Sequence, residues 1–328
     1  MTHNTDIIEQ FHVILAPLMP EDGKLALLDF PDHANVGDSA IWLGEIAYLK
    51  QWHQITPRYV SSLQTFSAEA MEQAVGRAPI FLHGGGNFGD LWPRHQVFRE
   101  LIVQRYPDRP IIQLPQSIHF NEGVNVAKAA SVINAHPDFT LLVRDKQSYD
   151  IAKEAFTCRV ELCPDMAFSL GAQHSRIHSR YPLLLLLRTD YESQTPAPTA
   201  SQLPPGAVVE DWLEERFSIY DRIRRRLPPP GFNALNYNAR RELRYRRLAE
   251  NRLVRGLRQL SSAQYIITDR LHAHILSILL NIPHVTLDDN YGKIRRFDET
   301  WTNGLTLSDA VESLDEAIVY YKDHCAAA

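Results

Sequence analysis

The chain has 328 residues, of which 45% are hydrophobic, and its 34 basic and 39 acidic side chains leave a formal net charge of -5. This length is typical of two compact domains, and the negative balance lacks the positive field that draws a protein onto nucleic acid, so we expect no nucleic-acid partner. Three cysteines without a C-x-x-C pair fit neither a disulfide framework nor a four-ligand zinc site, which favours a reducing cytoplasm.

The first half of the chain alternates short apolar runs with helix-forming stretches. The runs KLALLDF, RAPIFLH, RPIIQLPQS and DFTLLVRD are each followed by polar turn residues and then by a helical pattern. This alternation predicts a parallel sheet flanked by helices, and the carboxyl ends of such strands are where ligands bind. The residues ahead of these runs lack the basic and apolar regions of a signal peptide.

A second series of the same kind begins at YPLLLLLRTD and continues through AQYIITDR and PHVTLDD. The polar segment near residues 170–182 separates the two series. We therefore predict an α/β fold of two Rossmann-like domains that face a central cleft, over residues 1–175 and 176–328. We also expect the last helix to be able to pack back on the N-terminal domain. The longest apolar runs fall far below the ~20 residues that cross a bilayer.

The segment Asn35-Val36-Gly37-Asp38 lies between the first apolar run and a helical pattern. Glycine permits a sharp turn of the backbone, and the carboxylate of Asp38 suits the free N–H groups at a helix start. A structural cap is therefore as well supported as a functional group. In the functional interpretation, Asp38 lies at the mouth of the cleft and holds an acceptor hydroxyl.

A glycine-rich segment, HGGGNFGD at residues 83–90, follows the second apolar run. Three consecutive glycines are entropically costly, so the close approach of a ligand to the backbone explains them better than a turn alone. An esterase oxyanion loop also reads HGGG, but the chain contains no G-x-S-x-G nucleophile motif. The spacing also differs from the dinucleotide-binding and P-loop patterns, so neither ligand class is indicated.

Several other polar side chains follow predicted strands. Trp92 and His95 offer a face for sugar stacking and a proton shuttle, although a plain loop is nearly as well supported. Residues 115–117 end another apolar run and are interpreted as site lining. Arg144 presents a planar fork suited to carboxylate or phosphate beside a helix start, and the alternative is an ion pair with Asp145 or another acid.

The most informative stretch is TDRLHAH at residues 268–274, where a strand gives way to a helix. Arg270 and His272 flank one apolar residue and offer a charge clamp and an acid–base group to one anionic ligand. His272 and His274 lie about 200° apart around a helix, so they do not easily share a metal ion, and we expect no metal site. The absence of a D-x-D pair weakens the case for a metal-dependent nucleotide-sugar transferase.

Eight motifs in order resemble those of the polysaccharide pyruvyltransferase family: NVGDSAIW, HGGGNFGDLW, LPQS, VRDKQSY, CPDMAF, LLLRTDYE, ITDRLHAHILSILLNIPH and DNYGKI. The resemblance runs from about Asn35 to Lys293. It implies a fold similar to GT-B glycosyltransferases, phosphoenolpyruvate as the donor, a hexose as the acceptor and no separate cofactor. With the residues argued above, the predicted site consists of catalytic His272, Asp38 and His95, donor-binding Arg144, Arg270, Leu271, Gly85, Gly86 and Asn87, and acceptor-binding Asn35, Asp38, Trp92 and His95.

The resemblance implies a pyruvyltransferase that acts on a sugar of an exopolysaccharide or of its polyprenyl-diphosphate-linked precursor, forming a cyclic ketal and releasing phosphate. Two alternatives stay open: a GT-B-type glycosyltransferase that uses a nucleotide sugar, and a non-catalytic component of a polysaccharide assembly complex. The arginine-dense segment from Arg222 to Arg258 matches no family motif. A contact with anionic inner-membrane lipid or the acceptor's diphosphate is as well supported there as a solvated helix face with a loop.

Overall fold

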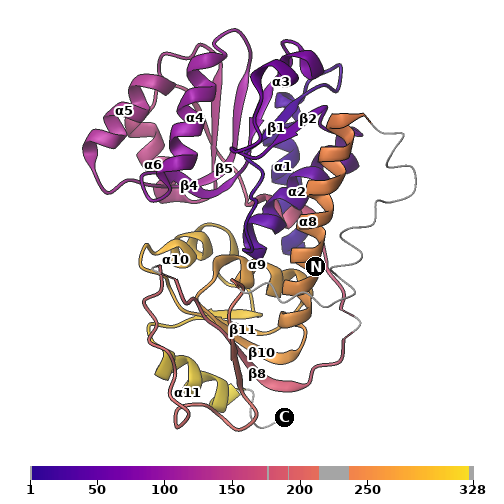
Figure 1. Ribbon diagram of the computed structural model, residues 1–328. Helices are drawn as coiled ribbons and strands as arrows, with labels where there is room; N and C mark the ends of the chain where they lie inside the picture. The colour runs from indigo at the N-terminus through magenta and orange to yellow at the C-terminus, as the bar shows by residue number, and fades with distance from the viewer. Residues whose placement is uncertain (1, 176, 191, 214–235, 325–328) are drawn as a thin grey trace.

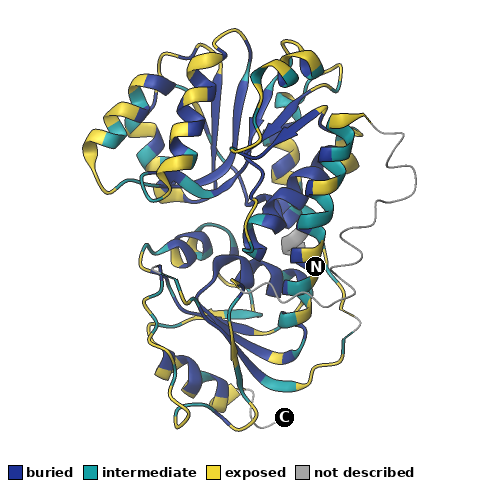
Figure 2. Ribbon diagram, in the orientation of Figure 1, coloured by how far each residue is buried: buried dark blue, intermediate teal, exposed yellow. Residues whose placement is uncertain are grey.

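The computed structural model describes residues 2–175, 177–190, 192–213 and 236–324. Within these residues the chain forms two parallel β-sheets, one above the other in Figure 1, with helices packed against them. The predicted α/β class with parallel sheets is confirmed. Figure 2 shows the strands almost wholly buried, while the exposed residues gather on the outer faces of the helices and in the loops.

The first sheet has seven strands, and each pairing is parallel. Short runs of Ile, Leu, Val and Phe suit it, because strands covered on both faces need apolar side chains on both sides. Across the sheet the strands are β2 (Tyr59–Ser61), β1 (Ala26–Leu28), β3 (Ile80–Leu82), β5 (Ile111–His119), β6 (Phe139–Val143) and β7 (Arg159–Leu162), with β4 (Gly85–Gly89) paired to β5.

Polar caps begin several helices of this half. The side chain of Ser67 accepts a hydrogen bond from the backbone of Ala70, and that of Asp145 accepts one from Ser148 at 2.8 Å. Such caps satisfy backbone N–H groups that have no partner within the helix. The helices are α1 (Thr2–Leu15), α2 (Val36–His53), α3 (Ala68–Val75), α4 (Pro93–Arg105), α5 (Gly123–Ile133) and α6 (Lys146–Ala155), with the short 3-10 helices η1 (Ala16–Leu18) and η2 (Met166–Leu170).

The second sheet has five parallel strands. Its leucine-rich strand lies between two neighbours, and the four leucines of that strand are buried on both faces. In order the strands are β12 (Ser308–Ala310), β11 (His284–Thr286), β10 (Ala263–Thr268), β8 (Tyr181–Leu186) and β9 (Val208–Glu210). The accompanying helices are α8 (Tyr237–Leu260), α9 (Leu271–Leu280), α10 (Lys293–Phe297), the π-helix η4 (Asp298–Thr302) and α11 (Leu314–His324).

Helix α8 connects the two sheets. Figure 1 shows it alongside both, and it packs against α2 and β2 of the first half as well as α9 and β10 of the second. One apolar cluster runs through both halves, with Val36 and Trp42 from the first and Leu184, Leu253 and Leu271 from the second. The division into domains 1–175 and 176–328 stays a prediction, because the core between the sheets is continuous.

In the described residues the last helix, α11, packs on the second sheet. The buried side chains of α11 include Leu314, Ile318 and Tyr321, which join a cluster with Leu183 and Tyr265 of the second sheet. The apolar side chains on one face of α11 are buried by packing against the second sheet. The connection back to the first half is made by α8 instead.

A tight contact between α2 and η2 generates a stability prediction. A Cβ at Gly44 would come 1.9 Å from the carbonyl oxygen of Met166. Alanine favours a helix over glycine by about 1 kcal/mol, but overpacking against backbone costs about 1–3 kcal/mol or more. We therefore expect Gly44→Ala to lower the free energy of unfolding, measured with urea.

The matched control is Gly123→Ala at the start of α5, where an added Cβ meets no atom within 4 Å. This variant should be as stable as the wild type or slightly more so. Equal stability of the two variants would contradict the close packing of α2 on η2.

Candidate active site

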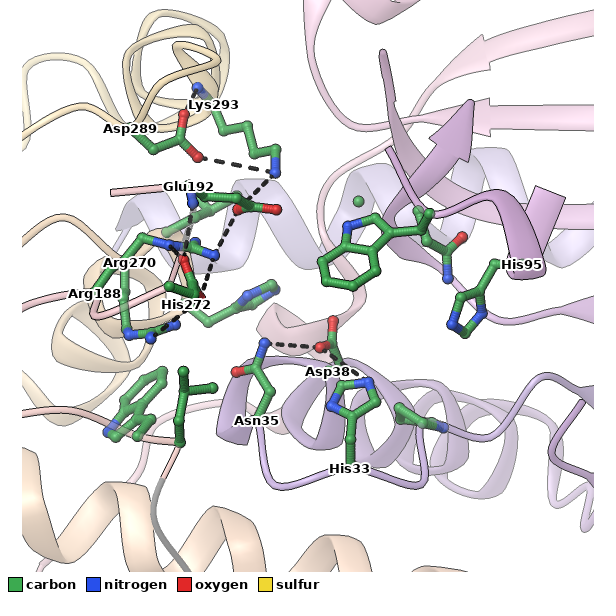
Figure 3. Close-up of a pocket in the computed structure, with 18 of the residues that line it drawn as sticks. His33, Asn35, Asp38, His95, Arg188, Glu192, Arg270, His272, Asp289 and Lys293 are labelled. Atoms are coloured by element: carbon green, nitrogen blue, oxygen red, sulfur yellow. Dashed lines mark hydrogen bonds and ion pairs between the residues drawn. The ribbon is translucent and has the colours of Figure 1, made fainter. Parts of the chain in front are cut away.

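The predicted site residues, apart from Gly85, meet in one cavity of about 410 Å³, with walls from both sheets (Figure 3). Most of the wall residues closely follow strands, as ligand-binding residues of parallel sheets do. Asp29 follows β1, Arg144 follows β6 and Arg270 follows β10. The predicted residues that line the cavity are Asn35, Asp38, Gly86, Asn87, Trp92, His95, Arg144, Arg270, Leu271 and His272.

Arg144 and His272 follow strands of different sheets and touch in this cavity. The Nη1 atom of Arg144 lies 3.5 Å from Nε2 of His272. The buried carboxylate of Asp165 lies 2.6 Å from the same arginine nitrogen and 3.4 Å from the same histidine nitrogen. Burial alone would raise the pKa of Asp165, but His272 and Arg144 outweigh burial and hold that pKa well below its usual range. Asp165 thus stays ionised and fixes both groups.

Further hydrogen bonds orient Arg144. Its Nε donates to Ser117 Oγ at 2.9 Å, and Ser117 donates to Asp145 Oδ2 at 2.8 Å. The ion-pair alternative is therefore confirmed for Arg144, with Asp165 rather than Asp145 as the acid. Arg144 also lines the cavity. Within the described residues no hydrogen bond involves Nη2, which leaves that end of the guanidinium available for a ligand.

Asp38 belongs to the first-half wall. Its Oδ2 accepts a hydrogen bond from Asn35 Nδ2 at 2.8 Å and lies 3.6 Å from His33 Nε2 (Figure 3). Burial would raise the pKa of Asp38, but His33 and His272 outweigh it and lower that pKa. The cap of α2 is Asn35, whose side chain accepts from the N–H of Gly37 at 3.0 Å. Asp38 is not the cap, so its carboxylate is left facing the cavity.

Position 37 requires glycine because it packs against His272, the proposed catalytic residue. A Cβ at this position would come 2.4 Å from Nδ1 of His272, far closer than non-bonded atoms approach. Any larger residue would therefore displace the imidazole. The glycine of the N-x-G-D segment thus serves the packing of His272 on the start of α2.

The other predicted arginine, Arg270, is also paired. Its Nε donates to Asp211 Oδ1 at 2.7 Å, and its Nη2 lies 2.5 Å from the same oxygen and 3.7 Å from Asp190. Asp211 follows β9 and belongs to none of the sequence motifs named above. Its pairing holds the guanidinium of Arg270 in the cavity wall, beside Leu271.

A chain of ion pairs completes the second-half wall. Arg188 Nη2 lies 2.6 Å from Glu192, and Lys293 Nζ lies 3.0 Å from the same carboxylate and 3.9 Å from Asp289 (Figure 3). Lys293 is only 8% exposed, so it is not a solvated loop lysine. The cavity therefore contains several cations, each balanced by a neighbouring carboxylate.

The glycine-rich segment packs closely against other parts of the protein. A Cβ at Gly84 would come 2.7 Å from the carbonyl of Pro115, and one at Gly86 would come 3.2 Å from Arg144 Nη2. Gly85 is not among the lining residues, and a Cβ there would make only ordinary contacts with Ile41 and Asp38, but its φ of 123° favours glycine. The N–H of Asn87 is taken by Gln116 Oε1 at 3.0 Å. Packing at Gly84 and Gly86 and the backbone conformation at Gly85 therefore explain these glycines at least as well as a ligand does.

Two histidine–carboxylate pairs lie in the first-half wall, and of their four residues the sequence predicted only His95 as a site residue. Nδ1 of His95 lies 2.8 Å from Asp29 Oδ2, and Nδ1 of His83 lies 2.9 Å from both oxygens of Glu45. Asp29 and His83 also line the cavity. Their positions directly after strands were the available signal, whereas Glu45 lies inside a helix without any motif. Asp165 stood in the motif CPDMAF without an assigned role.

His274 points away from the cavity. Its ring nitrogens lie 2.8 Å from His284 and 2.9 Å from Thr302. Burial lowers the pKa of both histidines, that of His284 to about 4. Among the described residues no group of three or more His, Cys, Asp or Glu side chains is placed to hold a metal ion.

The arginine-dense segment Arg222–Arg258 lies partly outside the described residues, which resume at residue 236. In its described part, Arg252 donates to the carbonyl of Pro31 at 3.0 Å, and Arg255 donates to that of Trp212 at 2.9 Å. These two cations therefore fasten α8 to loops that form the cavity wall. No helix in the described ranges combines the length and apolarity that crossing a bilayer requires.

Asp269, directly before Arg270, generates a pH prediction. Its Oδ1 accepts from the N–H of Arg188 at 2.8 Å, and burial raises the pKa of Asp269 to about 6 from the usual 3.8. A raised carboxyl pKa stabilises the fold below the unfolded-state value, and this contribution is lost as the pH rises through about 6. The neutral variant Asp269→Asn should therefore gain stability relative to the wild type as the pH rises from about 4 to 7, by up to about 3 kcal/mol.

Urea unfolding of both proteins across this pH range measures the difference. A difference in unfolding free energy that does not change with pH would contradict the buried, protonated state of Asp269.

Comparison with known proteins identifies the family. The family model described as polysaccharide pyruvyl transferase matches residues 35–291. "Pyruvyl transferase 1" of Schizosaccharomyces pombe is 36% identical over 319 residues, covering 90% of this chain and 74% of that protein. "Putative pyruvyl transferase EpsO" of Bacillus subtilis is 33% identical over 302 residues, covering 89% of each. A crystal structure of an uncharacterized protein from Klebsiella pneumoniae shares the fold, with a TM-score of 0.62 at 16% identity over 94% of this chain and 99% of that one. The chain belongs to the polysaccharide pyruvyl transferase family of enzymes.

Proposed function

We propose that this enzyme transfers the pyruvyl group of phosphoenolpyruvate to a sugar of an exopolysaccharide or of its lipid-linked precursor, forming a cyclic ketal and releasing phosphate. The observation that carries the proposal is the 3.5 Å contact between Arg144 and His272. An anion-binding guanidinium and an acid–base imidazole from different sheets lie side by side in one cavity. Membership of the polysaccharide pyruvyl transferase family supports the transfer of a pyruvyl group.

The donor carries about three negative charges near neutral pH, so its site needs several cations. Arg144, Arg270, Arg188 and Lys293 supply them, but each is already paired with a carboxylate. The donor must therefore add to these ion pairs or replace carboxylates in them. The Nη2 end of Arg144 offers a first contact without breaking its pair with Asp165.

In the proposed reaction, His272 gives a proton to the methylene carbon of the donor, which creates a cationic centre at the carbon that bears phosphate. A sugar hydroxyl held by Asp38 bonds to that carbon. A second hydroxyl of the same sugar then replaces phosphate and closes the ketal. The two protons lost by the hydroxyl groups balance the reaction. One returns to His272, which gave its own proton to the methyl group, and the other leaves with phosphate.

The two parallel sheets with a cavity between them fit the GT-B-like, two-domain architecture that we infer for this chain. A glycosyltransferase of that architecture would release a nucleoside diphosphate from a nucleotide sugar, whereas the proposed reaction releases inorganic phosphate and needs no cofactor besides the donor. Detection of these products separates the two functions directly.

The acceptor is proposed to be an oligosaccharide or a polyprenyl-diphosphate-linked glycan at the inner face of the membrane. Of the arginines in the described part of α8, Arg244 and Arg258 are exposed and available to an anionic headgroup. Arg252 and Arg255 are engaged with the first half, through the carbonyls of Pro31 and Ala34. Any peripheral membrane contact through this helix would therefore depend on the exposed arginines.

Removal of His272 and removal of Arg270 should change different kinetic constants. His272→Ala should lower kcat by roughly 10²–10⁴-fold and leave the KM for phosphoenolpyruvate nearly unchanged, because it removes the proton donor. Arg270→Ala should raise that KM by about tenfold or more, because it removes a cation that binds the ground state. Steady-state phosphate release measures both constants.

The control for Arg270→Ala is Arg77→Ala, since Arg77 is an exposed arginine in a surface ion pair with Asp108. It should behave like the wild type. Wild-type kinetics in both site variants would refute the assignment of Arg270 and His272.

A further inference from the structure

Two polar atoms in the first-half wall of the cavity have no hydrogen-bond partner among the described residues. They are Nε2 of His83 and Oδ1 of Asp29. The two residues are 2% and 4% exposed, and both line the cavity. Buried polar atoms are almost always paired, so two unpaired atoms in one wall indicate a bound group. The reaction steps described above use neither atom.

Neighbouring side chains set the role of each atom. Nδ1 of His83 is engaged by Glu45, which also accepts from the N–H of Gly84 at 2.9 Å. Burial alone would lower the pKa of His83, but Glu45 outweighs it and raises that pKa, which favours the imidazolium form, in which Nε2 also carries a hydrogen. Oδ2 of Asp29 is engaged by His95, which leaves Oδ1 as an acceptor.

The backbone at Asp29 is also unusual. Its φ of 71° lies in the left-handed region, which costs energy for a residue with a Cβ. Strained conformations of this kind concentrate at functional sites, where a side chain must be held in one place. Glycine would fit this backbone better, so the carboxylate is the reason to keep Asp29.

A hydroxyl group complements this pair of atoms, because it can both donate and accept a hydrogen bond. A hydroxyl oxygen between the two would donate to Asp29 Oδ1 and accept from His83 Nε2. The carboxylate of Asp29 would repel the anionic donor. The pair is therefore suited to the acceptor rather than to phosphoenolpyruvate.

We propose that Asp29 and His83 form a second hydroxyl-binding site beside that of Asp38, and that the two sites hold two hydroxyl groups of one acceptor sugar. This inference rests on the proposed function, because closing a cyclic ketal needs two hydroxyls of the same molecule. It names the acceptor class as a hexose with two closely spaced free hydroxyls.

The first test uses Asp29→Gly, which removes the carboxylate and suits the backbone conformation. We expect kcat/KM for the acceptor to fall by about 100-fold, the apparent KM for phosphoenolpyruvate to stay within about threefold, and the melting temperature not to fall. The probes are methyl hexopyranosides, screened for the one that wild-type enzyme converts. Asp108→Asn, a surface change, serves as the control and should match the wild type.

The second test asks which hydroxyl is bound. Analogues of the converted hexoside that lack one or the other ketal-forming hydroxyl are measured as competitive inhibitors. Wild-type enzyme should bind the parent about tenfold more tightly than each analogue. Asp29→Gly, and the double variant His83→Gln with Glu45→Gln that avoids an unpaired buried charge, should lose this preference for one analogue and keep it for the other.

The outcomes separate the inference from the proposed function. If wild-type enzyme releases no phosphate from phosphoenolpyruvate with any hexoside, the proposed function itself fails. If wild-type enzyme is active but Asp29→Gly and the double variant keep both preferences and the wild-type acceptor kinetics, the two atoms hold a buried water and the inference is overturned.

Discussion

Asp165 lies between the guanidinium of Arg144 and the imidazole of His272, and the position of the candidate active site depends on this buried carboxylate. A buried ion is costly unless it is well paired, so this arrangement holds only while both partners stay in place. One partner follows a strand of the first sheet and the other begins a helix of the second. Any displacement of one sheet against the other would break these contacts, and the continuous core between the sheets opposes such a displacement.

Arginines of α8 support the same arrangement from outside the cavity. Arg252 and Arg255 bond to carbonyls of the loops that hold Pro31 and Trp212, which both line the cavity. Because Arg252 also contacts Pro31 and Arg255 also contacts Ala34 of the first half, these two arginines join the two halves of the molecule. Within the cavity the cations are likewise paired with carboxylates. Under the proposed function, binding of the anionic donor would therefore depend on how these pairs rearrange and not on net positive charge.

Much of the fold followed from local patterns, because apolar runs and turn residues determine which segments become strands and where each ends. The same reasoning placed Asp38, Arg144, Arg270 and His272 near strand ends, and these residues meet in one cavity. The partners of these groups could not be predicted, since Asp165 reaches His272 across more than a hundred residues of sequence. The direction in which α11 packs and the bridging role of α8 likewise depend on three-dimensional contacts that no local pattern records.

The central claim is that an enol donor is protonated at its methylene carbon in this cavity. The most direct measurement is the reaction of wild-type enzyme in deuterium oxide with phosphoenolpyruvate and a converted hexoside, followed by mass spectrometry of the product. The account predicts a ketal whose methyl group carries at least one deuterium, together with inorganic phosphate. A pyruvylated product without deuterium in its methyl group, or a product that retains phosphate, would contradict it.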